Sequence, residues 1–221
     1  MTKKIYFQIG TNNGNDNFKK MVINDNPDLI ILVEPNIDLI DEIKDNYNDI
    51  LSKTVIYNNA IYYENDKELE LFFPSVNGIY DKKNKTGILA ENGYKYSDVH
   101  FSLLPMNDWG KKEDMVKLKT KSITFDKICE NENITTIDLL MIDTEGFDSE
   151  IIKMIDLNKY KIKKLIFEKW LFPTDAFTKY NNNDDELGIN GFNNSIKKLK
   201  EHNYEITESD DKCDIVAILK N

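Results

Sequence analysis

The sequence predicts an α/β fold, with a mostly parallel sheet and helices on both faces. Two observations support this prediction. Short apolar runs alternate along the chain with segments whose apolar residues recur every three or four positions, which is the spacing of one helix face. Most of these runs are apolar at successive positions, as parallel strands covered on both faces are. With 221 residues, 40% of them hydrophobic, the chain has enough apolar material for the core of a single domain over residues 1–221.

The first half of the chain reads as strand, helix, strand, helix, strand. An apolar run at residues 5–9 is followed by a turn rich in Gly and Asn, and the helix after this turn is expected to end at Asn26 and Pro27. The run at 29–33 predicts a strand buried on both faces, and 54–57 predicts a third strand. The two helical stripes consist of Phe18, Met21 and Val22, then Ile37, Ile40, Ile43 and Tyr47.

The middle of the chain interrupts this alternation. Residues 68–72 alternate between polar and apolar and predict a short exposed strand. From about 74 to 120 the periodicity is lost, and an irregular connection of this length in a compact domain is usually functional or disordered. We therefore expect an irregular insert at 74–120 that covers the mouth of a binding site.

Regular spacing resumes at Ser122, and the second half again alternates helix and strand. Its last two elements predict a closing strand pair. The expected elements are a short helix with Phe125, Ile128 and Cys129, a strand at 137–142, a helix with Ile151, Met154 and Ile155, a strand at 164–168, a helix with Ile196, Leu199 and Lys200, and strands at 204–207 and 214–219.

Composition excludes several classes of protein. The net charge of −10 disfavours a nucleic-acid partner, because affinity for nucleic acid depends mainly on Lys and Arg that neutralise phosphates. The apolar runs are far shorter than the roughly 20 residues of a membrane helix, so no membrane span is expected. The first residues lack the apolar core of a signal peptide, which predicts a cytoplasmic location. Two cysteines, Cys129 and Cys213, cannot form a disulfide framework or a four-cysteine zinc site, and we expect both to be buried as small apolar residues.

The turn after the first strand is the first candidate site. Glycine at such a turn permits a tight bend and a close approach of the backbone to a ligand. The spacing G-x-x-x-G differs from the G-x-G-x-x-G of dinucleotide sites, and an ordinary structural turn is the alternative. The segment reads Gln8, Ile9, Gly10, Thr11, Asn12, Asn13 and Gly14.

Acidic residues follow three predicted strands. Glu34 comes directly after the second strand, about 20 residues beyond Gly14, where an acid can accept hydrogen bonds from ribose hydroxyls. The alternative for Glu34 is a charge at a helix N-terminus. Asp143 and Glu145 follow the most apolar strand, and Glu168 ends the next one. These three acids could bind a hard divalent cation or supply a base, whereas helix capping and surface charge are the alternatives.

The insert carries further polar candidates. His100 could serve as a base near neutral pH, or it could be a surface or packing histidine. Five lysines lie between positions 111 and 121. They could meet a phosphate group on a ligand, and a solvated face is the alternative.

Several of these segments resemble one known family. The runs 8–14, 33–36 and 137–148, together with 166–168 and 213–217, are similar to the FkbM-type S-adenosylmethionine-dependent methyltransferases. The resemblance covers nearly the whole chain except the insert. It implies a Rossmann-like class I methyltransferase fold, in which the mostly parallel sheet has seven strands and an antiparallel last strand. It also implies O-methylation, often of sugar or polyketide hydroxyls.

The same resemblance implies a set of residues for S-adenosylmethionine. Gly10 to Gly14 would hold the methionine part, and Glu34, followed by Pro35, would hold the ribose. Asn59 and Ala60 would flank the adenine. Asp143 would lie beside the methionine amine and the reacting centre. Gln8 departs from the acid that most Rossmann-like methyltransferases have at this position, and we interpret it as a weaker contact. The expected cofactor-binding residues are Gln8, Gly10, Thr11, Asn12, Asn13, Gly14, Glu34, Pro35, Asn59, Ala60 and Asp143.

The sequence therefore predicts an O-methyltransferase acting on a hydroxyl of a sugar or glycoconjugate. Candidates for the base are Asp143, Glu145, Glu168 and His100, and magnesium is an additional candidate cofactor. We expect a small-molecule or glycan acceptor and no nucleic acid, and a homodimer stays open. One alternative is an NAD(P)-dependent sugar oxidoreductase, which Asn12 disfavours because it breaks the dinucleotide fingerprint. The others are an RNA methyltransferase, which the acidic charge disfavours, and a non-catalytic cofactor-binding module in a glycan-modifying complex.

Overall fold

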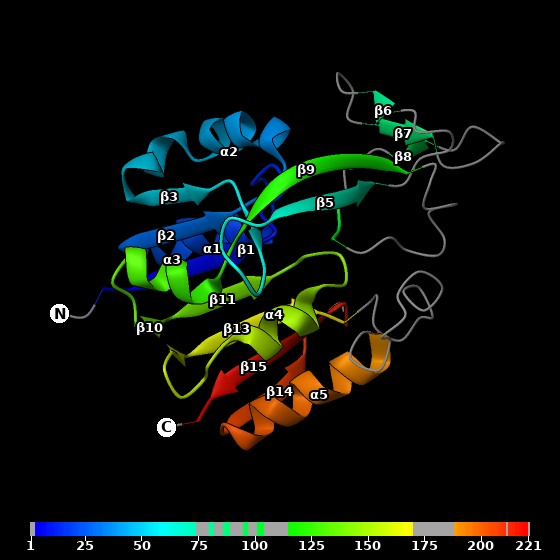
Figure 1. Cartoon of the computed structure of the whole chain (residues 1–221). Helices are drawn as coiled ribbons and strands as arrows, with labels where there is room; N and C mark the ends of the chain where they lie inside the picture. Colours follow the sequence, from blue (N-terminus) through cyan, green and yellow to red (C-terminus); the bar gives the residue numbers. More distant parts are fainter. Residues whose placement is uncertain are drawn as a thin grey trace.

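A seven-stranded sheet forms the centre of the protein (Figure 1). The computed structural model describes residues 3–73, 80–81, 86–88, 95–96, 101–103, 115–169, 188–210 and 212–220. The strand order is β14-β15-β13-β11-β1-β2-β3. Strands β1, β2, β3, β11 and β13 pair in parallel, and β15 is antiparallel to both of its neighbours. The predicted sheet, with its antiparallel last strand, is confirmed. The bounds are β1 (Ile5–Ile9), β2 (Leu29–Val33), β3 (Thr54–Tyr57), β11 (Leu139–Ile142), β13 (Lys164–Glu168), β14 (Tyr204–Glu208) and β15 (Asp214–Leu219).

Helices cover both faces of this sheet, as the continuous apolar strands require. On one face, α1 and α2 contribute Phe18 and Ile43 to a core cluster with Tyr6 of β1. On the other face, α3, α4 and α5 pack against Phe7 and the other side of the sheet. The bounds are α1 (Asn17–Asp25), α2 (Ile40–Asn46), α3 (Phe125–Asn131), α4 (Asp148–Met154) and α5 (Gly188–Glu201), with 3₁₀ turns η1 (Ile37–Leu39) and η2 (Asn48–Lys53) beside α2.

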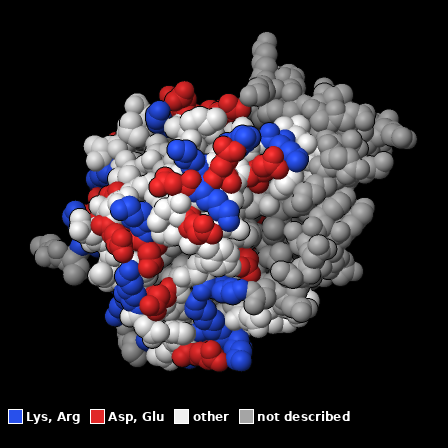
Figure 2. Space-filling model, viewed as in Figure 1, with Lys and Arg blue, Asp and Glu red and all other residues white. Residues whose placement is uncertain are grey.

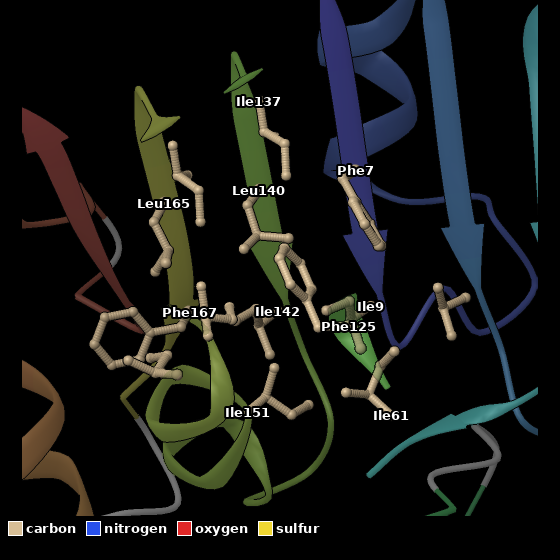
Figure 3. Packing of buried hydrophobic residues seen from close by; sticks show 14 of the residues in the cluster. Phe7, Ile9, Ile61, Phe125, Ile137, Leu140, Ile142, Ile151, Leu165 and Phe167 are labelled. Atoms are coloured by element: carbon tan, nitrogen blue, oxygen red, sulfur yellow. The ribbon is translucent and has the colours of Figure 1, made fainter. Parts of the chain in front are cut away.

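The second core cluster is the larger one and joins the strands to α3 and α4 (Figure 3). The ring of Phe7 stacks on Phe125 of α3 with centroids 5.3 Å apart. Ile142 of β11 and Ile151 of α4 are both about 1% exposed. Because strand side chains alternate between faces, Phe7 belongs to this cluster while its neighbour Tyr6 belongs to the other.

The start and end of α1 follow its local sequence. Asp16 is the N-cap, and its side chain accepts a hydrogen bond from Lys19 N at 2.9 Å. Asn26 adopts a left-handed conformation with φ 47° and donates its N–H to the carbonyl of Val22. The helix therefore ends where Asn26 and Pro27 predicted.

The predicted strand at 137–142 is wrong in one respect, because Asp138 divides it. The short strand β10 (Thr136–Ile137) pairs with β12 (Lys161–Ile162), whereas β11 pairs with β1 and β13. The carboxylate of Asp138 accepts hydrogen bonds from Ile5 N at 2.8 Å and Lys163 Nζ at 2.6 Å. An apolar run alone could not show this change of partners.

The predicted insert is partly wrong, since regular structure begins before residue 120. Strand β9 (Val116–Ile123) pairs antiparallel with β5 (Glu68–Phe73) and in parallel with β4 (Ala60–Ile61). Three further short strands form another sheet: β6 (Tyr80–Asp81), β7 (Thr86–Ile88) and β8 (Lys95–Tyr96). Figure 1 shows β5 and β9 extending past the carboxyl end of the central sheet.

Pairing with β9 also corrects one expectation and confirms another. The end of β5 was expected to be exposed, but Leu71 and Phe73 are buried. The exposed lysines Lys117 and Lys119 form ion pairs with Glu70 and Glu68 across the two strands, at 3.2 Å and 2.7 Å. For these lysines the solvated face is confirmed.

The two cysteines differ in exposure. Cys129 is buried as expected, but Cys213 is exposed, because it lies in the turn before β15 rather than in a core strand.

On the face seen in Figure 2, lysines and acidic side chains are interspersed over the described surface. None of the helices in the described ranges is long and apolar enough to cross a membrane.

We expect Gly10→Ala to destabilise the fold by at least about 2 kcal/mol. Gly10 has φ 81°, and a Cβ atom there would lie 1.6 Å from the carbonyl oxygen of Asp143. The backbone of one of the two turns must therefore move. Urea unfolding followed by circular dichroism measures the change in the free energy of unfolding.

Gly14→Ala is the matched comparison. Gly14 also has a positive φ, 76°, but the nearest atom to a Cβ there is Cε2 of the Tyr47 ring, at 3.0 Å. A side chain can shift where a backbone carbonyl cannot, so we expect a loss of only about 1 kcal/mol from the backbone conformation. Equal losses for the two variants would contradict this account of Gly10.

Candidate active site

A cavity opens at the carboxyl ends of β1, β2 and β11, where ligands bind in parallel α/β sheets. It spans about 740 Å³ when the open space at its mouth is included. Eight of the predicted site residues line it: Gly10, Asn12, Glu34, Pro35, Asn59, Ala60, Asp143 and Glu145. The structure thus brings together residues from three strand ends and from the start of β4.

The turn after β1 forms the floor of this cavity. Its backbone is held to the end of β2, because the N–H groups of Gly10 and Thr11 both donate to the carbonyl of Val33, at 2.9 Å and 3.2 Å. Thr11 is fully buried. Asn13 and Gly14 face α2 instead: Asn46 Nδ2 donates to the carbonyl of Asn13. Within the predicted motif, Ile9, Gly10 and Asn12 therefore line the cavity, and the other residues support the turn.

Glu34 links this turn to the residues that follow β2. Its carboxylate accepts hydrogen bonds from the backbone N–H of Asn12 at 2.7 Å and of Asn36 at 2.8 Å. The residue is 5% exposed, and burial raises the pKa of Glu34 to about 7. A carboxylate has about four lone-pair positions, so hydrogen bonds to two N–H groups leave acceptor capacity toward the cavity.

Gln8 lies beneath the turn and does not line the cavity. It is fully buried, and its Nε2 donates to the carboxylate of Asp16 at 2.5 Å. Its Oε1 has no hydrogen-bond partner among the described residues. Asp16 explains why an amide suits this position: an acid at residue 8 would place a buried carboxylate against the half-buried carboxylate of Asp16, the N-cap of α1.

The opposite wall of the cavity is apolar and was missed by the sequence analysis. Leu71 of β5, Phe101 and Leu103 of the insert, and Phe147 before α4 contribute to it. Phe101 and Leu103 flank Ser102, which exchanges backbone hydrogen bonds with Phe72 of β5. The alternation of β5 was a usable signal for Leu71, but the insert carries no periodicity that would have identified Phe101 or Leu103.

The acidic turn after β11 forms the third side. Asp143, Thr144 and Glu145 all line the cavity. Glu145 and Gly146 have positive φ values of 54° and 97°, which bend the chain sharply into α4. Ser102 Oγ donates to the carbonyl of Glu145 at 2.9 Å, so the insert is tied to this turn.

Asp148 and Glu168 form a buried acidic pair outside the cavity lining. Asp148 is fully buried and accepts hydrogen bonds from Thr144 Oγ1 at 2.7 Å, Thr144 N at 3.2 Å and Glu168 N at 3.3 Å. Oε2 of Glu168 is buried and has no partner among the described residues. Burial, and then the nearby carboxylates of Asp148, Glu145, Asp143 and Asp214, raise the pKa of Glu168 to about 10.

This arrangement decides where the proton of the pair resides. Burial raises the pKa of both acids, but the three donors hold the pKa of Asp148 to about 6, so we expect Glu168 to be the acid that carries the proton at neutral pH. A protonated Glu168 cannot accept a proton from a substrate. The structure therefore favours Asp143 and Glu145, which line the cavity, over Glu168 as candidates for a base.

Several expected site residues lie outside the described residues. They are the candidate base His100 and two lysines of the run between 111 and 121, Lys111 and Lys112. Within the described ranges, no group of three His, Cys, Asp or Glu side chains is arranged to hold a metal ion.

Comparison with known proteins identifies one family. Residues 8–206 match the family described as "Methyltransferase FkbM domain". No curated protein matches the chain. Among solved structures, the chain is similar to the fibrillarin pre-rRNA processing protein of Methanococcus jannaschii, with 13% sequence identity and a TM-score of 0.40, over 99% of this chain and 67% of that chain. The family match includes every strand end that borders the cavity.

We expect Glu168→Gln to stabilise the protein at alkaline pH. In the folded chain Glu168 keeps its proton up to about pH 10, whereas in the unfolded chain it ionises near its ordinary pKa of 4.5. The wild type therefore loses stability as pH rises between these two values, and the glutamine variant does not. The free energies of unfolding, measured with urea, should be nearly equal for the two proteins at pH 5. At pH 9 that of Glu168→Gln should be higher by at least about 1 kcal/mol.

The control for this experiment is Glu201→Gln, since Glu201 is an exposed glutamate late in α5. It should show the same difference from wild type at both pH values. A Glu168→Gln difference that does not change with pH would contradict a protonated Glu168.

Proposed function

Because the chain belongs to the FkbM methyltransferase family, we propose that it is an S-adenosylmethionine-dependent O-methyltransferase acting on a hydroxyl of a sugar or glycoconjugate. The observation that supports this proposal most directly is the cavity, in which Glu34, the Gly10 turn and Asp143 meet at the carboxyl ends of β2, β1 and β11. Family membership also favours a methyltransferase over the NAD(P)-dependent oxidoreductase.

The residues present fit the proposed cofactor. Glu34 is a buried acceptor that lines the cavity and would hold the ribose, and Pro35, Asn59 and Ala60 line the same cavity and would border the adenine. Gly10 lines the same cavity, so its backbone would border the methionine part. Asp143, which also lines the cavity, could accept hydrogen bonds from the methionine ammonium group. When bound, S-adenosylmethionine supplies the methyl group for transfer to an oxygen.

The chain itself would contribute orientation and proton removal. Much of the rate of a methyl transfer comes from holding the acceptor oxygen in line with the methyl group, and the apolar wall of Leu71, Phe101 and Leu103 gives an acceptor a surface to lie against. A hydroxyl must lose its proton as the new C–O bond forms. Asp143 and Glu145 are the carboxylates that line the cavity and could accept this proton.

Other expectations stay predictions. They concern a role for His100, the use of magnesium, a cytoplasmic location and a homodimer. Methylation assays with and without magnesium would decide the second of these.

Calorimetric titration with S-adenosylmethionine and S-adenosylhomocysteine tests the proposed cofactor. We expect binding in the micromolar range and a loss of at least about tenfold for Glu34→Ala, which removes the ribose acceptor. The control is Glu205→Ala, since Glu205 is exposed on β14 and far from the cavity lining. A folded wild-type protein that binds neither compound would contradict the proposal and make NAD(P) the next ligand to titrate.

The pKa of Glu34 predicts how binding depends on pH. Glu34 has a pKa of about 7 in the folded chain, and only its ionised form is a full acceptor for two ribose hydroxyls. Affinity should therefore increase as pH rises from 6 to 8. 5′-Methylthioadenosine is the suitable ligand, because it has the ribose and adenine but no amine or carboxylate that titrates.

Glu34→Gln provides the control for this pH series. A glutamine has no charge to lose, so its affinity for 5′-methylthioadenosine should stay level between pH 6 and 8. An equal pH dependence in wild type and Glu34→Gln would assign the effect to another group.

A further inference from the structure

We propose that Asp148 is a positioning residue that holds the acidic turn, and with it Asp143, in the conformation that binds the methionine end of the cofactor. The inference rests on the proposed function, since it concerns the same cavity. It adds a residue that neither touches the cavity nor was identified in the sequence analysis.

The first argument is the environment of Asp148. The side chain is fully buried at the start of α4, yet it carries a carboxylate rather than an apolar group. A buried charge is costly unless several donors surround it. Asp148 has such donors, and all of them belong to the ends of two neighbouring strands: Thr144 N and Oγ1 after β11, and Glu168 N at the end of β13.

The second argument is the position of Thr144. It stands between Asp143 and Glu145, and all three residues line the cavity. Asp148 binds both the backbone N–H and the hydroxyl of Thr144, so it fixes the main chain of the turn as well as one side chain. Among the described residues, the same turn meets Gly10 on one side and Ser102 on another. Of Gly10, Ser102 and Asp148, only Asp148 is charged, and it accepts two hydrogen bonds from the turn, both from Thr144.

The third argument is that asparagine could not replace Asp148 equally well. One oxygen of an asparagine could accept from Thr144, but its NH₂ group would then face the N–H of Glu168, which is also a donor. In the other orientation the NH₂ group would face the N–H of Thr144, so either orientation sets two donors against each other while the volume of the side chain stays the same. We therefore expect the backbone at Asp143 to move in Asp148→Asn.

Two ligands separate positioning from general stability. S-adenosylhomocysteine has the aminocarboxylate end that Asp143 would contact, and 5′-methylthioadenosine lacks it but keeps the adenosine end near Glu34. We expect Asp148→Asn to weaken S-adenosylhomocysteine binding by about tenfold and to change 5′-methylthioadenosine binding by less than about twofold. A side chain with a merely structural role would change both affinities by the same factor.

Asp138→Asn is the matched control. Asp138 lies at the other end of β11 and also accepts hydrogen bonds from a backbone N–H and a side chain of neighbouring elements, those of Ile5 and Lys163. Its replacement should lower the free energy of unfolding but leave the ratio of the two affinities unchanged. Equal changes of this ratio in Asp138→Asn and Asp148→Asn would overturn the proposal.

Thr144→Val gives a second test that keeps the buried charge and is therefore less exposed to a folding failure. It removes the Oγ1–Asp148 hydrogen bond, and we expect a smaller loss of S-adenosylhomocysteine affinity in the same direction. In the double variant the two losses should not add, because they act through one contact. Additive losses would overturn the proposal.

The wild-type titrations distinguish the two levels of inference. In one outcome the wild type binds both ligands, and Asp148→Asn weakens both affinities equally or changes neither. This outcome would overturn the role of Asp148 and leave the cofactor assignment intact. Wild type that binds neither ligand would overturn both.

Discussion

The close approach of the Gly10 turn to the carbonyl oxygen of Asp143 is the constraint on which the rest of the site depends. β1 and β11 are adjacent strands in parallel register, so their turns emerge side by side at the same edge of the sheet. Only a residue without Cβ leaves room for the Asp143 carbonyl there. This contact joins the glycine turn and the acidic turn into one continuous border of the cavity, opposite which Leu71, Phe101 and Leu103 form the apolar wall.

The polar groups of the site are oriented mainly by backbone N–H groups. Glu34 is held by Asn12 and Asn36, and Asp148 by Thr144 and Glu168. Each carboxylate joins two segments that are distant in sequence, so the electrostatics of the site and the packing of the strand ends are coupled. Burial raises the pKa of both groups, and the hydrogen bonds from backbone donors offset part of that effect.

Most of the fold could be predicted because its signals are local. Periodicity identified the strands of the central sheet and the helices α1 to α5 of the described residues, and Asn26 marked the end of α1 where the structure has it. The errors arose where partners are chosen across the chain. Asp138 divides a continuous apolar run by bonding to Ile5, and β9 is stabilised by cross-strand pairs with Glu68 and Glu70 that no local pattern shows.

The sequence by itself determined the order of the elements and the polar residues that follow each strand, because both depend on spacing along the chain. It placed Glu34, Asp143 and Glu145 at strand ends, and these residues line the cavity. Only the tertiary structure decided that Gln8 supports the turn from below, that burial and nearby carboxylates raise the pKa of Glu168, and that Asp148 binds the acidic turn. The reason is physical: burial and proton affinity depend on which distant groups the packed sheet brings within a few ångströms of one another.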